Sequence, residues 1–151
     1  MSPQNADMGL SVLAVKQLVY EWFARLTDHA PLAEMEALLN VDRVEMTFPE
    51  TTVNGQQEFR AWYDTVTHKF FDQVHELKML HVEVAENLAT VHLVVNWQAR
   101  TWDPPQGFSE WVGAYADQVW TVEPHRQTGV AAITTYRVTR FVPMSGPLKI
   151  G

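Results

Sequence analysis

Hydrophobic residues in the N-terminal half of the chain recur at the three- or four-residue spacing of amphipathic helices. This spacing predicts a first helix over Leu10–Leu26 and a second, shorter helix that begins at Pro31. A third helix is predicted after the turn signal Asn54-Gly55, where mostly aromatic residues follow the same spacing. Between the second and third helices, residues 44–48 alternate apolar and polar side chains, and they predict a short strand that ends before a proline.

From about Gln73 the hydrophobic period changes to two, which is the period of a strand. The alternation predicts four consecutive long strands, over Gln73–Val84, Leu88–Trp102, Glu110–Glu123 and Thr128–Val142. Because the breaks between them are short, the sheet is expected to be mainly antiparallel. We therefore predict an α+β fold in which a cone-shaped, curved, mainly antiparallel sheet of one short and four long strands wraps around three helices of the N-terminal half. Residues 1–151 are expected to form a single domain with an ordered core over about 8–142 and a loosely held tail over 143–151.

Composition and charge limit the classes of partner, cofactor and metal site that are expected for the chain. The chain of 151 residues has 11 basic and 18 acidic side chains, so nucleic acid and anionic membranes are not expected as partners. It has no cysteine, which excludes disulfides and thiolate metal sites, and its six histidines lack the spacing of a metal site. No glycine-rich phosphate loop is present, so no cofactor is expected. The N-terminus lacks the pattern of a signal peptide, which makes the cytoplasm the default location.

The order of the predicted elements resembles the nuclear transport factor two-like superfamily, in particular its SnoaL-like and scytalone-dehydratase-like branch, from Leu10 to Val142. Local support comes from the segments QLVYEWFARLTD, VNGQQEFRAWY, VHELKMLHVEVAENLATVHLVVNW and ITTYRVTRF. The resemblance implies a sheet wrapped around a deep pocket, and often a homodimer formed through sheet faces. The same scaffold hosts isomerases, dehydratases, cyclases, dioxygenase subunits and binding proteins, so the fold does not fix the reaction.

Two residues are the catalytic candidates. His75 opens the first long strand, where the resemblance to scytalone dehydratase implies a pocket histidine that accepts or delivers a proton. Alternatively, its ring is hydrogen-bonded to the backbone at the strand end. Asp117 lies in the middle of the third long strand, and pocket carboxyls on such strands act as bases or protonated donors in ketosteroid isomerase, a relative in this superfamily. Alternatively, Asp117 points outward beside Arg100 or Arg137, because alternation does not say which face the helices cover.

Aromatic residues are the strongest collective signal, with six Trp, seven Phe and four Tyr. They suit a flat apolar ligand, or else a filled aromatic core. The residues expected to contact a substrate are Tyr20, Phe23, Phe48, Trp62, Tyr63, Trp97 and Tyr115. Within this set, the hydroxyls of Tyr20 and Tyr63 are the candidates for polarising a substrate oxygen.

The leading hypothesis is a cofactor-independent dehydratase, isomerase or cyclase that acts on a small cyclic or polyketide-like molecule. The alternative is a non-catalytic, small-molecule-binding or accessory dimeric module of the same fold. A subunit of a larger oxygenase is a third reading, and it requires a partner chain.

Overall fold

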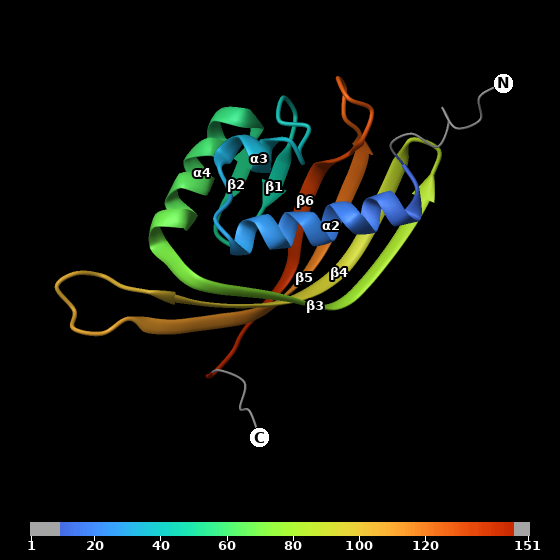
Figure 1. Ribbon diagram of the computed structural model, residues 1–151. Coiled ribbons are helices and arrows are strands. Elements are labelled where there is room, and N and C mark those ends of the chain that lie inside the picture. The colour runs from blue at the N-terminus through green and yellow to red at the C-terminus, as the bar shows by residue number, and fades with distance from the viewer. Residues whose placement is uncertain (1–9, 147–151) are drawn as a thin grey trace.

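In a computed structural model that describes residues 10–146, the helices lie on one side of a single curved sheet (Figure 1). The helices are α2 (Val12–Thr27), α3 (Leu32–Glu36) and α4 (Gly55–Lys69). The strands are β1 (Glu45–Thr47), β2 (Thr52–Asn54), β3 (Phe70–Ala85), β4 (Leu88–Thr101), β5 (Glu110–Pro124) and β6 (Ala131–Pro143). The sheet order is β2-β1-β6-β5-β4-β3, and its pairs are antiparallel except for β1 with β6. The predicted α+β fold with a curved sheet and helices in the N-terminal half is confirmed.

The structure adds one short strand that the sequence pattern did not predict. Strand β2 pairs with β1 in a hairpin, and its three residues are too few to display an alternation. The pair Asn54-Gly55, which had indicated a turn, is the junction between β2 and α4. Gly55 adopts a φ of 76° there, a conformation that glycine reaches at low cost.

Aromatic rings fill the space between the helices and the sheet. The ring of Trp22 on α2 lies 6.3 Å from Phe59 on α4, 6.4 Å from Trp120 on β5 and 5.6 Å from Tyr136 on β6. Trp120 and Tyr136 stack with their centroids 4.9 Å apart. These four side chains are almost completely buried. The sequence allowed either a large open pocket or a filled aromatic core. These four rings form an aromatic core.

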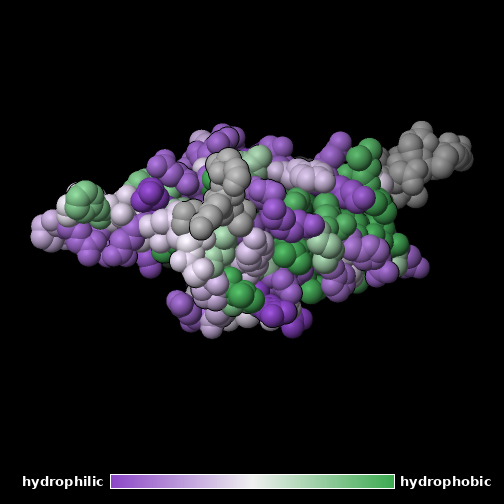
Figure 2. Space-filling view, turned by 90° about the horizontal axis from the view of Figure 1, so that it is seen from below, coloured by the Kyte–Doolittle hydropathy of each residue, from purple (hydrophilic) through white to green (hydrophobic). Residues whose placement is uncertain are grey.

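The two faces of the long strands differ in what covers them. On β5, Ala114 and Ala116 are buried on the face toward the helices, which we call the concave face. Asp117 alternates with them and therefore lies on the opposite, convex face, where it pairs in register with Val94 and Arg140. Figure 2 shows the molecule from below, on this convex side, where hydrophobic side chains gather over part of the face and hydrophilic ones border them.

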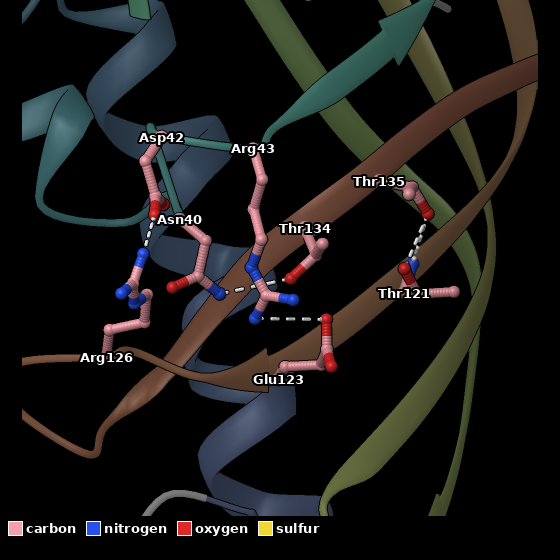
Figure 3. A network of polar contacts seen from close by, with 8 residues as sticks. All are labelled: Asn40, Asp42, Arg43, Thr121, Glu123, Arg126, Thr134 and Thr135. Carbon is pink, nitrogen blue, oxygen red and sulfur yellow. Dashed lines mark hydrogen bonds and ion pairs between the residues drawn. The ribbon is translucent and has the colours of Figure 1, made fainter. Parts of the chain in front are cut away.

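A polar cluster ties the connection between α3 and β1 to the hairpin of β5 and β6 (Figure 3). We call it the hairpin cluster, and its residues are Asn40, Asp42, Arg43, Thr121, Glu123, Arg126, Thr134 and Thr135. The buried amide of Asn40 donates to Thr134 Oγ1 at 3.0 Å. Around this bond, Arg126 pairs with Asp42, and an Arg43 nitrogen lies 3.4 Å from a carboxylate oxygen of Glu123. The cluster fixes β1 against the neighbouring end of β6.

The described part of the predicted loose tail is held against the sheet. The backbone N–H of Met144 donates to Gly113 O at 2.9 Å, and the Asn96 amide donates to Met144 Sδ at 3.1 Å. Residues 8–9 of the predicted core and 147–151 of the predicted tail lie outside the described residues. Among the helices within residues 10–146, none is long and apolar enough to cross a membrane.

Candidate functional site

His75 lies on the concave face of β3, in register with Trp97 of β4. Its Nδ1 atom is 2.9 Å from the hydroxyl oxygen of Thr27, and its ring centroid is 5.4 Å from that of Phe23. The ring reaches a cavity of about 470 Å³ between α2 and β3, which we call the α2–β3 groove. The groove is lined by Tyr20, Phe23, Ala24, Thr27, Asp28, His75, Glu76 and Leu77.

The local sequence explains why this wall of the groove forms. The hydroxyl of Ser11 accepts the backbone N–H of Ala14 at 3.0 Å and caps the start of α2. From there the apolar face of α2 packs onto the sheet, and the helix ends at Thr27 above the edge strand β3. His29 then adopts a φ of 52°, which turns the chain away from the helix axis. The last residue of α2, Thr27, therefore places its hydroxyl group next to the imidazole of His75.

Burial makes the His75 ring hard to protonate. Desolvation lowers the pKa of His75 from 6.5 to about 4, and the neighbouring imidazole of His29 opposes protonation to a smaller extent. The described hydrogen-bond partner of the ring is a hydroxyl group rather than a carboxylate, so this contact supplies no negative charge to oppose the shift. The imidazole is therefore neutral at physiological pH, with Nδ1 held by Thr27.

A second set of hydrogen bonds lies beside His75. Trp97 Nε1 donates to Gln73 Oε1 at 3.0 Å, and Gln73 Nε2 lies 2.6 Å from His29 Nε2. We call Thr27, His29, Gln73, His75 and Trp97 the groove cluster. The sequence had drawn attention to His75 and Trp97 but not to the other three, because their roles depend on two backbone irregularities. One is the left-handed His29, and the other is the shift in β3–β4 register between Phe71 and Val74 that surrounds Gln73.

Asp117 does not share a site with His75. The two side chains lie on opposite faces of the sheet, since His75 is on the concave face and Asp117 on the convex face. The outward alternative for Asp117 is the arrangement in the structure, although its register partner on β6 is Arg140 rather than Arg137. Tyr115 alternates in step with Asp117 and therefore also lies on the convex face.

The expected substrate-contacting aromatics divide between several places. Of these side chains, Tyr20 and Phe23 line the α2–β3 groove with His75. Phe48 and Trp62 stack on each other with centroids 5.1 Å apart, away from the groove. The remaining ring on α4, that of Tyr63, is buried in the core, and its hydroxyl donates to Ala30 O.

Trp97 has a different environment from the other candidates. Its ring packs edge-on against Phe70 at 4.9 Å and lines a second cavity of about 490 Å³ near the end of α4. Within residues 10–146, no three His, Cys, Asp or Glu side chains gather in a way that could hold a metal ion. The chemistry that the groove offers is that of a neutral imidazole with nearby hydroxyl and carboxyl groups.

Comparison with known protein families identifies the family of the chain. The model of the SnoaL-like domain matches residues 10–137, which include the whole groove cluster. The chain belongs to the SnoaL-like family. No sequence among curated proteins matches this SnoaL-like chain.

Solved structures share the fold of this SnoaL-like protein at low sequence identity. A candidate scytalone dehydratase from Novosphingobium aromaticivorans has a TM-score of 0.74 and 16% identity, over 91% of this chain and 88% of that one. The hexachlorocyclohexane dehydrochlorinase LinA-type3 from Novosphingobium barchaimii has a TM-score of 0.69 and 16% identity, over 92% and 93%. A nuclear transport factor two-like superfamily protein from Salmonella enterica has a TM-score of 0.68 and 18% identity, over 92% of each chain. At these identities the likeness is one of fold.

Proposed function

We propose that this SnoaL-like protein is a cofactor-independent lyase or isomerase that transfers a proton on a hydrophobic, cyclic or polyketide-like molecule bound in the α2–β3 groove. The observation that carries the proposal is the placement of His75. Its imidazole lines the groove with Nδ1 at 2.9 Å from the Thr27 hydroxyl, which leaves the other ring nitrogen, Nε2, for the proposed reaction. A titratable group in a cavity with a strongly shifted pKa is a functional-site candidate.

The low pKa of His75 keeps its imidazole neutral at physiological pH, which is the form that can accept a proton. A neutral imidazole with a pKa of about 4 is a weak base, and the imidazolium that it forms gives its proton away readily. In a dehydration, Nε2 takes the proton from the carbon next to a carbonyl. The electron pair of that C–H bond forms the C=C bond as the bond to the β-hydroxyl breaks.

The hydroxyl of Tyr20 is the group in the groove that donates a proton to the departing oxygen. It lines the same cavity as His75 from α2, whereas the hydroxyl of Tyr63 is bound to Ala30 O. The Tyr20 hydroxyl protonates the departing hydroxide to give water, and the imidazolium of His75 returns a proton to the tyrosine. Each group thus ends in its starting state, and the dehydration needs no cofactor. An isomerisation would use the same imidazole to return the proton at another carbon.

The test is turnover of a panel of β-hydroxylated cyclic ketones, followed by the ultraviolet absorbance of the conjugated enone. We expect His75→Ala to lower kcat by about 10²–10⁴-fold. His81→Ala is the matched control, because His81 lies on the same strand but is exposed, and it should keep full activity. Tyr20→Phe should lower kcat by a smaller factor. Full turnover by His75→Ala on a substrate that the wild type converts would contradict the proposal.

A non-catalytic binding module is the second candidate, and the aromatic core favours it. The rings of Trp22, Phe59, Trp120 and Tyr136 fill the space where a deep pocket was expected, and Asp117 lies on the opposite face from His75. This alternative predicts saturable binding of an apolar probe, measured by calorimetry, that survives His75→Ala without turnover of any member of the panel.

We further propose that the protein forms a homodimer through the convex face. Exposed apolar side chains such as Val74 and Met79 lie there, and Figure 2 shows hydrophobic groups gathered on this side. On this face β3 carries Glu83 and Glu76, the latter paired with Lys78, whereas β6 carries Arg137 and Arg140. A two-fold axis along the strands lays the acidic edge of one copy over the basic edge of the other.

The dimer is tested by the native mass at low micromolar concentration. We expect the mass of two chains for the wild type. Val119→Glu, on the convex face of β5, should give the mass of one chain, whereas Glu50→Gln, in an exposed turn, should leave the dimer intact. A monomeric wild type would contradict this proposal.

A further inference from the structure

Two residues in left-handed conformations bring the side chains of His29 and Gln73 together. His29 follows the end of α2 with a φ of 52°, and Asp72, just before Gln73, has a φ of 51°. Such conformations are uncommon for residues other than glycine, and they persist where the surrounding structure holds them in place. Here they place His29 Nε2 at 2.6 Å from Gln73 Nε2, beside His75.

The indole of Trp97 decides which way the Gln73 amide faces. An indole N–H donates hydrogen bonds and accepts none, so the atom that it contacts at 3.0 Å is the amide oxygen of Gln73. The amide NH₂ therefore faces His29, and an NH₂ group can only donate. His29 Nε2 must accept this bond with its lone pair. It follows that the ring of His29 is neutral, with its proton on Nδ1.

This assignment matters for His75 because the two imidazoles are neighbours. A positive charge on His29 makes protonation of His75 less favourable. If His29 took a proton at Nε2, two N–H donors would face each other across the contact with Gln73. Protonation of His29 at Nε2 would therefore cost the hydrogen bond with Gln73.

We propose that Gln73 is a positioning residue that, oriented by Trp97, holds His29 in its neutral Nδ1–H form and so keeps a positive charge away from His75. The inference rests on the proposed function for its catalytic consequence. The locked state of His29 is a property of the folded protein and can be measured without turnover.

Other titratable groups surround the two rings, and they bear on the design of the test. Tyr20 on α2 and Asp28 just after it line the groove, and Glu76 borders it at the edge strand β3. Tyr63 approaches from α4, where its hydroxyl donates to Ala30 O, next to His29. None of these four is changed in the variants below, so their contributions to the two histidines are held constant in the comparison.

The experiment is a nitrogen-15 NMR titration of the histidine rings, with His29 and His75 assigned by single replacement. In the wild type we expect one His29 tautomer, protonated at Nδ1. Gln73→Glu replaces the donor by a carboxylate that accepts from both Trp97 and His29. It should favour the charged form of the His29 ring, because an adjacent opposite charge stabilises that form. Gln57→Glu, which places the same charge on the exposed surface of α4, should change neither ring.

Trp97→Phe keeps the charge of the chain and removes the indole N–H. It frees the Gln73 amide to rotate, so both neutral tautomers of His29 should appear. With a converted substrate, Gln73→Glu should also shift the pH profile of kcat/KM, while Gln57→Glu should not. A wild-type His29 protonated at Nε2, or an identical His29 titration in Gln73→Glu and the wild type, would overturn the inference. Full turnover by His75→Ala would instead defeat the proposed function and leave the His29 result standing.

Discussion

The groove cluster and the hairpin cluster are both polar, yet they stabilise their surroundings in opposite ways. The hairpin cluster is held by ion pairs whose side chains are largely exposed, around one buried bond between Asn40 and Thr134. The groove cluster is held by side-chain hydrogen bonds, such as that between Thr27 and His75, and it lies against a cavity of about 470 Å³. The first joins β1 to β6, and the second joins the end of α2 to β3 and β4.

The difference separates residues that are expected to affect only the stability of the fold from residues that are also expected to affect proton uptake. In the hairpin cluster the described groups satisfy one another, so a change there is expected to act on folding alone. In the groove cluster burial lowers the pKa of His75 to about 4, which weakens its affinity for a proton. Changes in this cluster should therefore alter proton uptake as well as stability.

The largest expected difference between the two clusters is their response to acid. The folded protein holds His75 neutral down to about pH 4, whereas the unfolded chain protonates it near pH 6.5. Because the unfolded state binds the extra proton, this contribution to stability is present above about pH 6.5 and is lost as the pH falls toward 4. The loss is on the order of 3 kcal/mol in the free energy of unfolding.

Urea unfolding at pH 7 and pH 4 measures this loss. His75→Asn should flatten the pH dependence, and His81→Asn, at an exposed site on the same strand, should keep that of the wild type. An unchanged pH dependence in His75→Asn would show that other groups cause the acid sensitivity.

In the hairpin cluster, Asn40→Ala should have the next largest effect. It removes the buried amide that donates to Thr134 Oγ1 at 3.0 Å and should cost about 1–3 kcal/mol in the free energy of unfolding. Chemical denaturation at pH 7 measures the loss. Ligand binding in the α2–β3 groove should not change, and altered binding would show that the two clusters are coupled.

A matched pair of threonine variants sharpens the comparison at smaller magnitude. Thr27→Val removes the hydrogen bond to His75 Nδ1, and Thr135→Val removes the bonds of its hydroxyl to the backbone N–H and the hydroxyl of Thr121. Each lost hydrogen bond should cost about 0.5–1.5 kcal/mol. Only Thr27→Val should change the NMR titration of His75. Equal titrations of His75 in the two variants would argue against a role for Thr27 in holding the ring.

The smallest expected effect belongs to the exposed pair of Arg126 and Asp42. Surface ion pairs contribute little and are screened by salt. Arg126→Ala should therefore lower Tm by less than Asn40→Ala, and the difference from the wild type should shrink at 1 M salt. A decrease in Tm as large as that of Asn40→Ala, and unchanged at high salt, would contradict the description of Arg126 and Asp42 as an exposed ion pair.

The sequence predicted most of the fold because its periodic segments are long. The alternation that begins near Gln73 continues across β3 to β6, and amphipathic spacing marks α2 and α4, so both types of element follow from hydrophobic pattern. Strand β2 escaped prediction because three residues show no period. The pair Asn54-Gly55 also differs from its predicted role as a turn, because Gly55 is the first residue of α4.

The candidate site was less predictable, for two physical reasons. Alternation tells which residues of β5 share a face but not which face the helices cover, so Asp117 could be expected either in the site or outside it. The contact between His29 and Gln73 depends on left-handed residues that hydrophobic pattern does not reveal. His75 was singled out because it lies near the start of a predicted long strand, where the family resemblance implies a pocket histidine.

The most direct test of the account is a crystal structure of the protein with a bound member of the β-hydroxy ketone panel. The account predicts that the ligand lies in the α2–β3 groove, with a reacting carbon or oxygen atom about 2.6–3.2 Å from His75 Nε2 and Nδ1 still bound to Thr27. A ligand seated elsewhere, with His75 Nε2 contacting only protein atoms, would contradict the claim that this imidazole carries the chemistry.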